Sequence, residues 1–233
     1  IDRYEEIVDG LECRIVTCGK RTDSNYRAED ITYDHFARAA FRLMIDGQDA
    51  GEITLGVPGE HNVYNALAAI ALCRDLGIDM EHIRAGLKKF TGTNRRFEKK
   101  GEIGGVTIID DYAHHPQEIA ATLAAAKNYP HKKLWCVFQP HTYTRTKAFL
   151  DQFAQALSAA DEVVLADIYA ARETDTLGIS SQTLQAEIEK LGKPCYYFPT
   201  FEEIEKFLLK KNISYDTLLY VKKKRWHNGK RIC

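Results

Sequence analysis

From Arg95 onward, short apolar segments alternate with longer segments whose apolar residues recur at helical spacing. The strand-like segments are Val106–Ile109, Leu134–Phe138, Glu162–Ala166, Cys195–Phe198 and Thr217–Tyr220. The helix-like segments between them are Pro116–Lys127, Arg145–Ala159, Ser181–Leu191 and Phe201–Lys210. Strands that alternate with helices usually form a parallel sheet covered by helices on both faces. The pattern therefore predicts an α/β domain with a mostly parallel sheet.

The preceding region has short strand-like segments followed by two helix-like ones. The strand-like segments are Arg14–Cys18, Ala39–Ile45 and Glu52–Leu55, and the helix-like segments are His61–Leu76 and Met80–Phe90. Asp46-Gly47 is a hairpin-type turn signal. The turn cluster Thr91–Asn94 marks a boundary. We therefore expect one domain at residues 1–93, a second at 94–221, and an atypical basic tail at 222–233.

Polar clusters follow three of the strand-like segments. They are DDYAHHP at Asp110–Pro116, QPHTYTRT at Gln139–Thr146 and DIYAARE at Asp167–Glu173. Ligands of open α/β sheets bind outside the carboxyl ends of the strands, so residues of these clusters can reach one ligand. Asp110 and Asp111 can accept hydrogen bonds from ribose hydroxyls, and His141 with Arg145 can hold a small carboxylate. Thr144 is the expected N-cap of the helix that follows.

Two other groups are candidate ligand contacts. His61, Asn62 and Asn65 fall in the first turns of a helix, where Asn62 and Asn65 share a face. An asparagine amide can donate to and accept from a purine edge, although His61 and Asn62 can equally serve as helix caps. Arg95 and Arg96 suit phosphate or carboxylate, with a surface ion pair to Glu98 as the alternative.

Composition and charge exclude some functions. The net charge is −1, which predicts no nucleic-acid partner. The six cysteines form no CxxC pair and no zinc-finger spacing, which is typical of a reducing, cytoplasmic compartment. No secretory signal or membrane span is evident, so we expect no membrane partner. Adjacent histidines such as His114 and His115 make a poor ligand pair, and we predict no metal site on this chain.

In this order, RRFE, DDYAHHP, QPHTYTRT and DIYAARE resemble the C-terminal domain of the Mur ligases of peptidoglycan synthesis. GEHNVYNALAA is similar to the family's helix near the ATP base. The resemblance implies a Rossmann-like C-terminal sheet domain preceded by the latter part of a central ATPase domain. It also implies ATP-dependent joining of L-alanine to UDP-N-acetylmuramate through an acyl phosphate.

The resemblance implies roles for individual residues. The expected ATP contacts are His61, Asn62, Asn65, Arg96 and Asp111. The expected L-alanine contacts are Tyr112, His114, His141 and Arg145, of which His114, His141 and Arg145 are the catalytic candidates and Arg145 the carboxylate partner. Mg²⁺ is expected as a cofactor whose ligands lie upstream of this chain.

The chain also departs from the family pattern. No G-x-x-x-x-G-K-[ST] phosphate loop occurs in it, and its end, YVKKKRWHNGKRIC, does not match the family. We therefore expect a fragment, lacking the amino-terminal half of the enzyme and inactive alone. Two alternatives remain open: the related ligase that recycles murein peptide, and a nucleotide- or amino-acid-binding module without catalysis.

Overall fold

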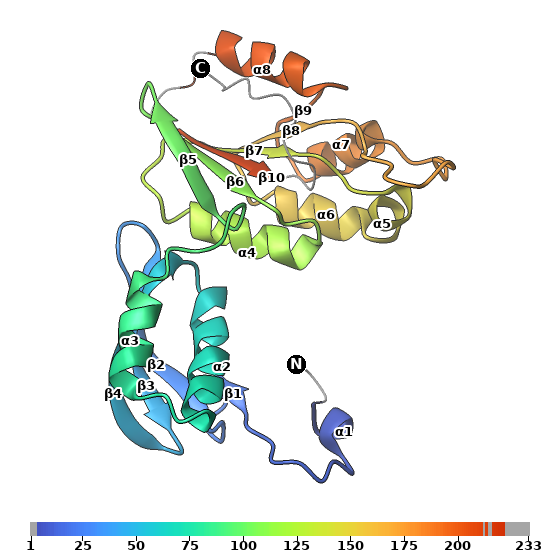
Figure 1. Cartoon of the computed structure of the whole chain (residues 1–233). Coiled ribbons are helices and arrows are strands. Elements are labelled where there is room, and N and C mark those ends of the chain that lie inside the picture. Colours follow the sequence, from blue (N-terminus) through green and yellow to red (C-terminus); the bar gives the residue numbers. More distant parts are fainter. Residues whose placement is uncertain (1–3, 212, 214–215, 222–233) are drawn as a thin grey trace. The chain divides into compact units, whose positions relative to one another are not determined.

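The computed structural model describes residues 4–211, 213 and 216–221 (Figure 1). The basic tail expected at residues 222–233 lies outside these described residues. The chain divides into two compact units. The first comprises Ile1–Asp34 and Arg38–Thr91, and the second His35–Ala37 and Gly92–Cys233.

The first unit contains a four-stranded sheet and three helices. Its elements are α1 (Tyr4–Val8), β1 (Cys18–Gly19), β2 (Tyr26–Tyr33), β3 (Arg38–Ile45), β4 (Gln48–Pro58), α2 (His61–Asp75) and α3 (Met80–Lys89). The strand order is β1-β2-β3-β4, with β1 parallel to β2 and the other pairs antiparallel. Asp46 and Gly47 join β3 to β4 with φ of 47° and 78°, as expected of an Asp-Gly hairpin turn. Val63, Leu67 and Ile70 of α2 belong to the core cluster formed with this sheet.

One expectation for this unit is wrong, and one strand was missed. A strand was expected at Arg14–Cys18, but the observed strand β1 shares only Cys18 with this range. Ile15 and Val16 are 40% and 36% exposed and do not pack in the core. Strand β2 was not expected, because charged residues interrupt its apolar pattern. In the sheet, Arg27 of β2 pairs with Glu29 at 2.6 Å.

The second unit is built on a six-stranded sheet. Its elements are β5 (Glu98–Ile103), β6 (Val106–Asp111), α4 (Pro116–Ala126), β7 (Leu134–Phe138), α5 (Tyr143–Ala148), α6 (Leu150–Leu157), β8 (Glu162–Leu165), α7 (Ser181–Lys190), β9 (Cys195–Tyr197), α8 (Phe201–Lys210) and β10 (Thr217–Val221). The strand order is β5-β6-β10-β7-β8-β9, and only β5 is antiparallel to its neighbour. The mostly parallel α/β fold expected from the sequence is confirmed.

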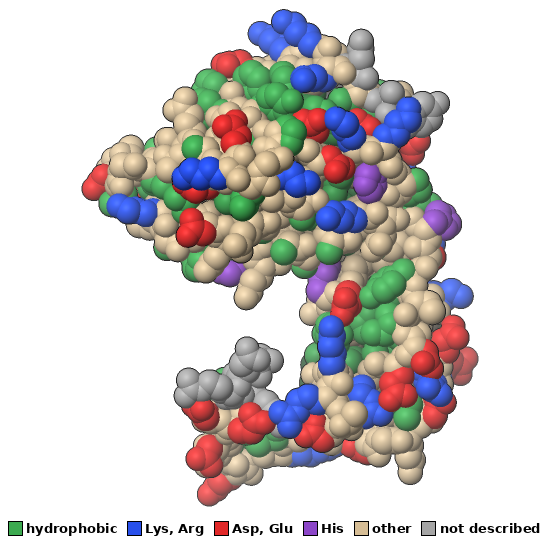
Figure 2. Space-filling model, turned by 180° about the vertical axis from the view of Figure 1, so that it is seen from behind, with side chains coloured by type: hydrophobic (Ala, Val, Ile, Leu, Met, Phe, Trp, Pro, Cys, Tyr) green, Lys and Arg blue, Asp and Glu red, His purple; other side chains and the backbone are tan. Residues whose placement is uncertain are grey.

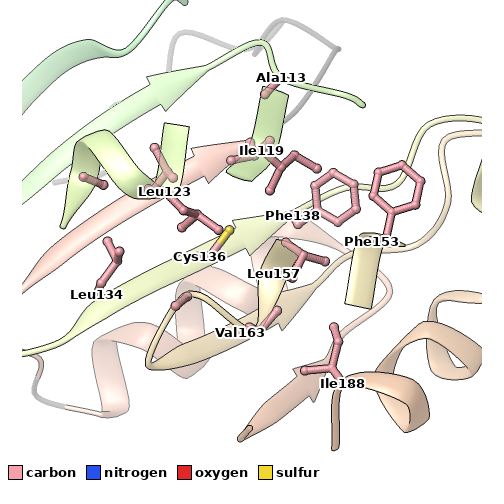
Figure 3. Packing of buried hydrophobic residues seen from close by; sticks show 14 of the residues in the cluster. Ala113, Ile119, Leu123, Leu134, Cys136, Phe138, Phe153, Leu157, Val163 and Ile188 are labelled. Atoms are coloured by element: carbon pink, nitrogen blue, oxygen red, sulfur yellow. The ribbon is translucent and has the colours of Figure 1, made fainter. Parts of the chain in front are cut away.

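Helices cover both faces of this sheet, as Figure 1 shows. On one face, α4, α6 and α7 pack over a core that includes Phe138, Phe153, Leu157 and Ile188. Figure 3 shows the rings of Phe138 and Phe153 next to each other, and their centroids lie 5.5 Å apart. On the other face, α8 packs over a separate cluster that contains Trp135.

The structure corrects two expectations in the second unit. Strand β5 was not expected, because its sequence, EKKGEI, is mostly polar and it lies at the edge of the sheet. The single helix expected at Arg145–Ala159 is two helices, α5 and α6. The break is at Phe149, whose φ of −118° and ψ of 25° are not helical.

On the face drawn in Figure 2, basic and acidic side chains are interspersed and form no large area of one sign. Among the described residues, no helix is both long and apolar enough to cross a membrane.

Phe153→Ala tests the core on the α6 face. Phe153 is fully buried, so its truncation removes contacts with Phe138 and leaves a cavity. We expect the free energy of unfolding to fall by about 3–5 kcal/mol. Urea denaturation followed by circular dichroism measures this loss. The control is Leu191→Ala, because Leu191 is 50% exposed and its truncation should have a much smaller effect.

Candidate functional site

The three polar clusters meet at the carboxyl edge of the second unit's sheet. Strands β6 and β7 are separated by β10, yet the rings of His114 and His141, which follow them, have centroids 6.4 Å apart. Tyr112 lies 5.6 Å from His114, and Tyr169 lies 5.6 Å from His141. The four rings form one continuous row along this edge. The predicted proximity of His114 and His141 is confirmed.

The Asp111 carboxylate holds the loop at the end of β6. One of its oxygens accepts a hydrogen bond from the Phe97 N–H and the other from the Ala113 N–H, each at 2.7 Å. Asp111 is 5% exposed. The expected bond from a ribose hydroxyl would have to share oxygens already bound to the backbone. Asp111 therefore anchors the turn that carries Arg95 and Arg96.

The two arginines of this turn lie against one aromatic ring. The guanidinium carbons of Arg95 and Arg96 lie 4.7 and 5.5 Å from the centroid of the Tyr112 ring. Arg95 Nε also lies 3.5 Å from the Asp110 carboxylate, in a largely buried pair. Glu98, the alternative partner expected for the arginines, accepts the Arg95 backbone N–H at 2.7 Å and pairs with Lys100.

Glu118 fixes the position of His114. Its carboxylate accepts hydrogen bonds from the backbone N–H of His114 at 2.9 Å and of His115 at 3.3 Å, and lies 3.3 Å from His114 Nδ1. Burial raises the pKa of Glu118, but the two N–H donors and the nearby His114 and Arg96 outweigh it, so the pKa lies below its ordinary value. The carboxylate is therefore charged near neutral pH.

His115 caps a helix, whereas His114 belongs to the row of rings. Its Nδ1 accepts from the Gln117 N–H at 3.3 Å, which makes it the N-cap of α4, and Pro116 occupies the first helical position. Its ring packs against Phe149 with centroids 4.9 Å apart. The two adjacent histidines thus point to different neighbours. In the part of the chain that the structure describes, no group of three or more His, Cys, Asp or Glu residues is arranged to hold a metal ion.

The end of β7 supplies His141 and Arg145. The expected N-cap at Thr144 is wrong: α5 begins at Tyr143 and its N-cap is Thr142, which has a left-handed φ of 66°. The Thr142 hydroxyl accepts the Arg145 N–H at 3.4 Å. His141 is 9% exposed. Arg145 Nη1 is buried and has no hydrogen-bond partner among the described residues, so it can still bind an acceptor.

The end of β8 runs beside the end of β7. Thr142 donates its N–H to the Tyr169 carbonyl at 2.9 Å, and Tyr169 donates to the Pro140 carbonyl at 2.9 Å. The Tyr197 hydroxyl donates to Asp167 at 2.5 Å, and this bond raises the pKa of Tyr197 to about 12. Backbone pairing thus continues beyond the sheet and fixes the position of Tyr169 next to His141.

In the first unit, the start of α2 presents the two asparagines. Asn62 donates to the Pro58 carbonyl at 2.8 Å and accepts from the Asn65 amide at 3.0 Å. The N-cap residue is Glu60, which makes no side-chain cap bond, so the alternative of His61 or Asn62 as the cap is wrong. Asn65 and His61 are exposed on the helix surface.

Sequence reasoning gave no positioning role to two carboxylates of the second unit. Glu118 lies three residues after the N-cap His115, a spacing typical of a capping box, so a local signal was present. Glu173 contacts Tyr143 and Thr144, about thirty residues away, and no local pattern indicates such a contact.

The second unit is thus a doubly wound α/β domain with polar and aromatic residues gathered at its strand ends. Residues 95–224 match the family described as Mur ligase, glutamate ligase domain, and residues 2–73 match the Mur ligase middle domain. The chain belongs to the Mur ligase family. This confirms the resemblance drawn from its motifs.

Individual members of this family are similar to the chain to different degrees. Over 220 residues the chain is 60% identical to the UDP-N-acetylmuramate–L-alanine ligase of Lachnospira eligens, a match that covers 94% of this chain and 48% of that protein. It is 31% identical to the UDP-N-acetylmuramate-alanine ligase of Thermotoga maritima, with a TM-score of 0.74 over 88% of this chain and 44% of that one. The murein peptide ligase of Psychrobacter arcticus shares the fold, with a TM-score of 0.60 and 24% identity over 86% of this chain and 41% of that one. The chain spans about half the length of the curated relatives it matches.

Glu118→Gln tests the charge that holds His114. Because the folded-state pKa of Glu118 is lowered, its charge should stabilise the fold fully above the ordinary value of 4.5, and this contribution should disappear as the pH falls through the lowered pKa. The wild-type chain should therefore be more stable than the variant at pH 7, and the two should converge in acid.

Urea midpoints of both proteins across the acid-to-neutral range measure this difference. Glu81→Gln is the control, because Glu81 is an exposed carboxylate in the first turn of α3. Its urea midpoint should follow that of the wild type throughout. If the urea midpoint of Glu118→Gln stays below that of the wild type by the same amount at every pH, the charge of Glu118 does not stabilise the fold.

Proposed function

We propose that this chain forms the amino-acid-binding part of a ligase that joins L-alanine to UDP-N-acetylmuramate. In the proposed reaction, ATP phosphorylates the substrate carboxylate, the L-alanine amine attacks the acyl phosphate, and phosphate leaves to give an amide. The ligase would act in the cytoplasm, in peptidoglycan synthesis. The observation that carries the proposal is the buried Arg145 Nη1, which has no hydrogen-bond partner among the described residues and follows the same strand, β7, as His141 of the ring row.

Arg145 is the proposed partner of the L-alanine carboxylate. A guanidinium can make two parallel charge-assisted hydrogen bonds to a carboxylate, and a buried donor without a partner is costly unless a ligand supplies one. Tyr112, His114 and His141 would place the amine against the acyl phosphate. Holding the reacting groups in the right geometry can supply a large part of a rate enhancement. The anchoring of His114 by Glu118 supports this role.

The proposed ATP contacts are His61, Asn62 and Asn65 of the first unit and Arg96 and Asp111 of the second. Arg96 fits a phosphate, because it is exposed and its guanidinium lies over the Tyr112 ring. Asp111 fits an indirect role, because it holds the backbone next to Arg96. Asn65 is exposed and can bind a base edge. We assign no Mg²⁺ ligand to this chain.

A chimera tests the proposed reaction. In this chimera, the part of the Lachnospira eligens ligase that lies outside its match to this chain is fused to this chain. We expect phosphate release that depends on ATP, UDP-N-acetylmuramate and L-alanine together. Release with a murein peptide in place of L-alanine would favour the murein peptide ligase. The chain without the added part should release none, because it has no phosphate loop.

Arg145→Ala in this chimera tests the assigned partner. We expect the KM for L-alanine to rise on the order of ten- to a hundred-fold, as for the loss of a charge-assisted contact, while the KM for ATP changes little. Arg145→Lys keeps the charge but loses the planar fork, so it should restore only part of the affinity. A defect mainly in the KM for ATP would mean that Arg145 binds a different ligand.

A further inference from the structure

The Glu173 carboxylate lies against the start of α5. One oxygen accepts the backbone N–H of Tyr143 at 2.5 Å and of Thr144 at 3.1 Å, and the other accepts the Thr144 hydroxyl. The Thr144 hydroxyl contributes most to holding the pKa of Glu173 below its ordinary value, and the two N–H donors add to it, against a raising effect of burial. A charged carboxylate at a helix start also interacts favourably with the helix dipole.

The start of α5 needs this support for two reasons. The helix spans only Tyr143–Ala148, and so short a helix is not stable by itself. Its N-cap, Thr142, is a β-branched residue with a φ of 66°, a conformation that persists only when its surroundings hold it. The Thr142 side chain accepts the Arg145 N–H at a long 3.4 Å. Glu173 therefore supplies the shorter bonds at this helix start.

Arg145 lies one residue beyond the Thr144 that Glu173 holds. Its Nη1 is buried without a hydrogen-bond partner in the described part of the chain, so the backbone of α5 has a large share in setting where the guanidinium points. His141 lies just before the same turn, and its backbone is bridged to Tyr169 of the segment that leads to Glu173. The positions of His141 and Arg145, two of the proposed L-alanine contacts, thus depend on the pairing of the segment after β7 with the segment after β8.

We propose that Glu173 is a positioning residue that fixes the start of α5 and thereby aims the Arg145 guanidinium at the L-alanine carboxylate. The assignment rests on the function proposed above for Arg145. Glu173 itself does not contact the reacting atoms. Its effect passes through the Tyr143 and Thr144 amides to the backbone of Arg145.

The contact itself is tested on the chain without any ligand. Amide hydrogen exchange of Tyr143 and Thr144 is measured in the wild type, in Glu173→Ala and in Glu202→Ala. Glu202 is the matched control, because it is an exposed acid in the first turn of α8, on the opposite face of the sheet. Exchange at Tyr143 and Thr144 should become at least about tenfold faster in Glu173→Ala only. Equal exchange in all three proteins would overturn the proposal.

The functional consequence is tested by kinetics in the chimera. Glu173→Ala should raise the KM for L-alanine about tenfold, the size of effect expected when a hydrogen-bonded position is lost, with little change in the KM for ATP. Glu173→Gln should restore most of the affinity, because its amide oxygen can still accept both N–H groups. Glu202→Ala should match the parent. A purely structural defect would lower the amount of active enzyme, and hence the apparent kcat, without changing the KM for L-alanine.

The outcomes separate this inference from the proposed function. If Arg145→Ala raises the KM for L-alanine and both Glu173 variants leave it unchanged, Glu173 has no positioning role and the proposed function stands. If the parent chimera does not use L-alanine, both the proposed function and this inference fail. If it does, but Arg145→Ala leaves the KM for L-alanine unchanged, the assigned role of Arg145 and this inference fail, and the proposed reaction stands. If Glu173→Ala does not fold, Glu173→Gln decides: a KM within about threefold of the parent with intact amide protection supports the role, and lost protection with an unchanged KM overturns it.

Discussion

The position of β10 between β6 and β7 is the constraint on which the site depends. Parallel pairing of β10 with both strands aligns their carboxyl ends. The chain leaves β6 for β7 on one face, covered by α4, and returns to β10 through α8 on the other face. The helices that follow β6 and β7, α4 and α6, pack on the same face, so the loops that lead into them leave the sheet toward the same side of its carboxyl edge. His114 and His141 approach each other at this edge, although their strands are not neighbours.

Hydrogen bonds to carboxylates then fix the loops that the sheet topology brings to one edge. Asp111 joins the end of β6 to the turn before β5, so that Arg95 and Arg96 reach the Tyr112 ring. Glu118 fixes the backbone of His114. On the β7 side, the carboxylate that serves the same purpose is Glu173. In each case, an acceptor takes up backbone N–H groups of a loop and leaves a neighbouring side chain able to face a ligand.

The sequence predicted those features that local patterns control. The apolar run Leu134–Phe138 became β7 without change, and α8 has its expected bounds, because burial on both faces and helical periodicity are strong signals. The sequence did not reveal contacts between distant segments, such as the bonds of Glu173 to the start of α5. Strand β5 pairs with the next strand, β6, but its polar sequence lacks an apolar strand pattern. No local signal marked the break at Phe149. The motifs correctly predicted that His114 and His141 lie close together. Thr144 was misplaced by two residues as the N-cap, because a left-handed φ at Thr142 is not evident from sequence.

The proposed function requires the ends of β6 and β7 to bind one ligand. Histidine-selective NMR of the chain, titrated with L-alanine, measures this binding at both strand ends. His131, in the loop that precedes β7, is an internal reference at the other end of that strand. We expect the ring signals of His114 and His141 to shift together, with one dissociation constant, while the signals of His131 stay unchanged. Separate dissociation constants for His114 and His141, or shifts no larger than that of His131, would contradict it.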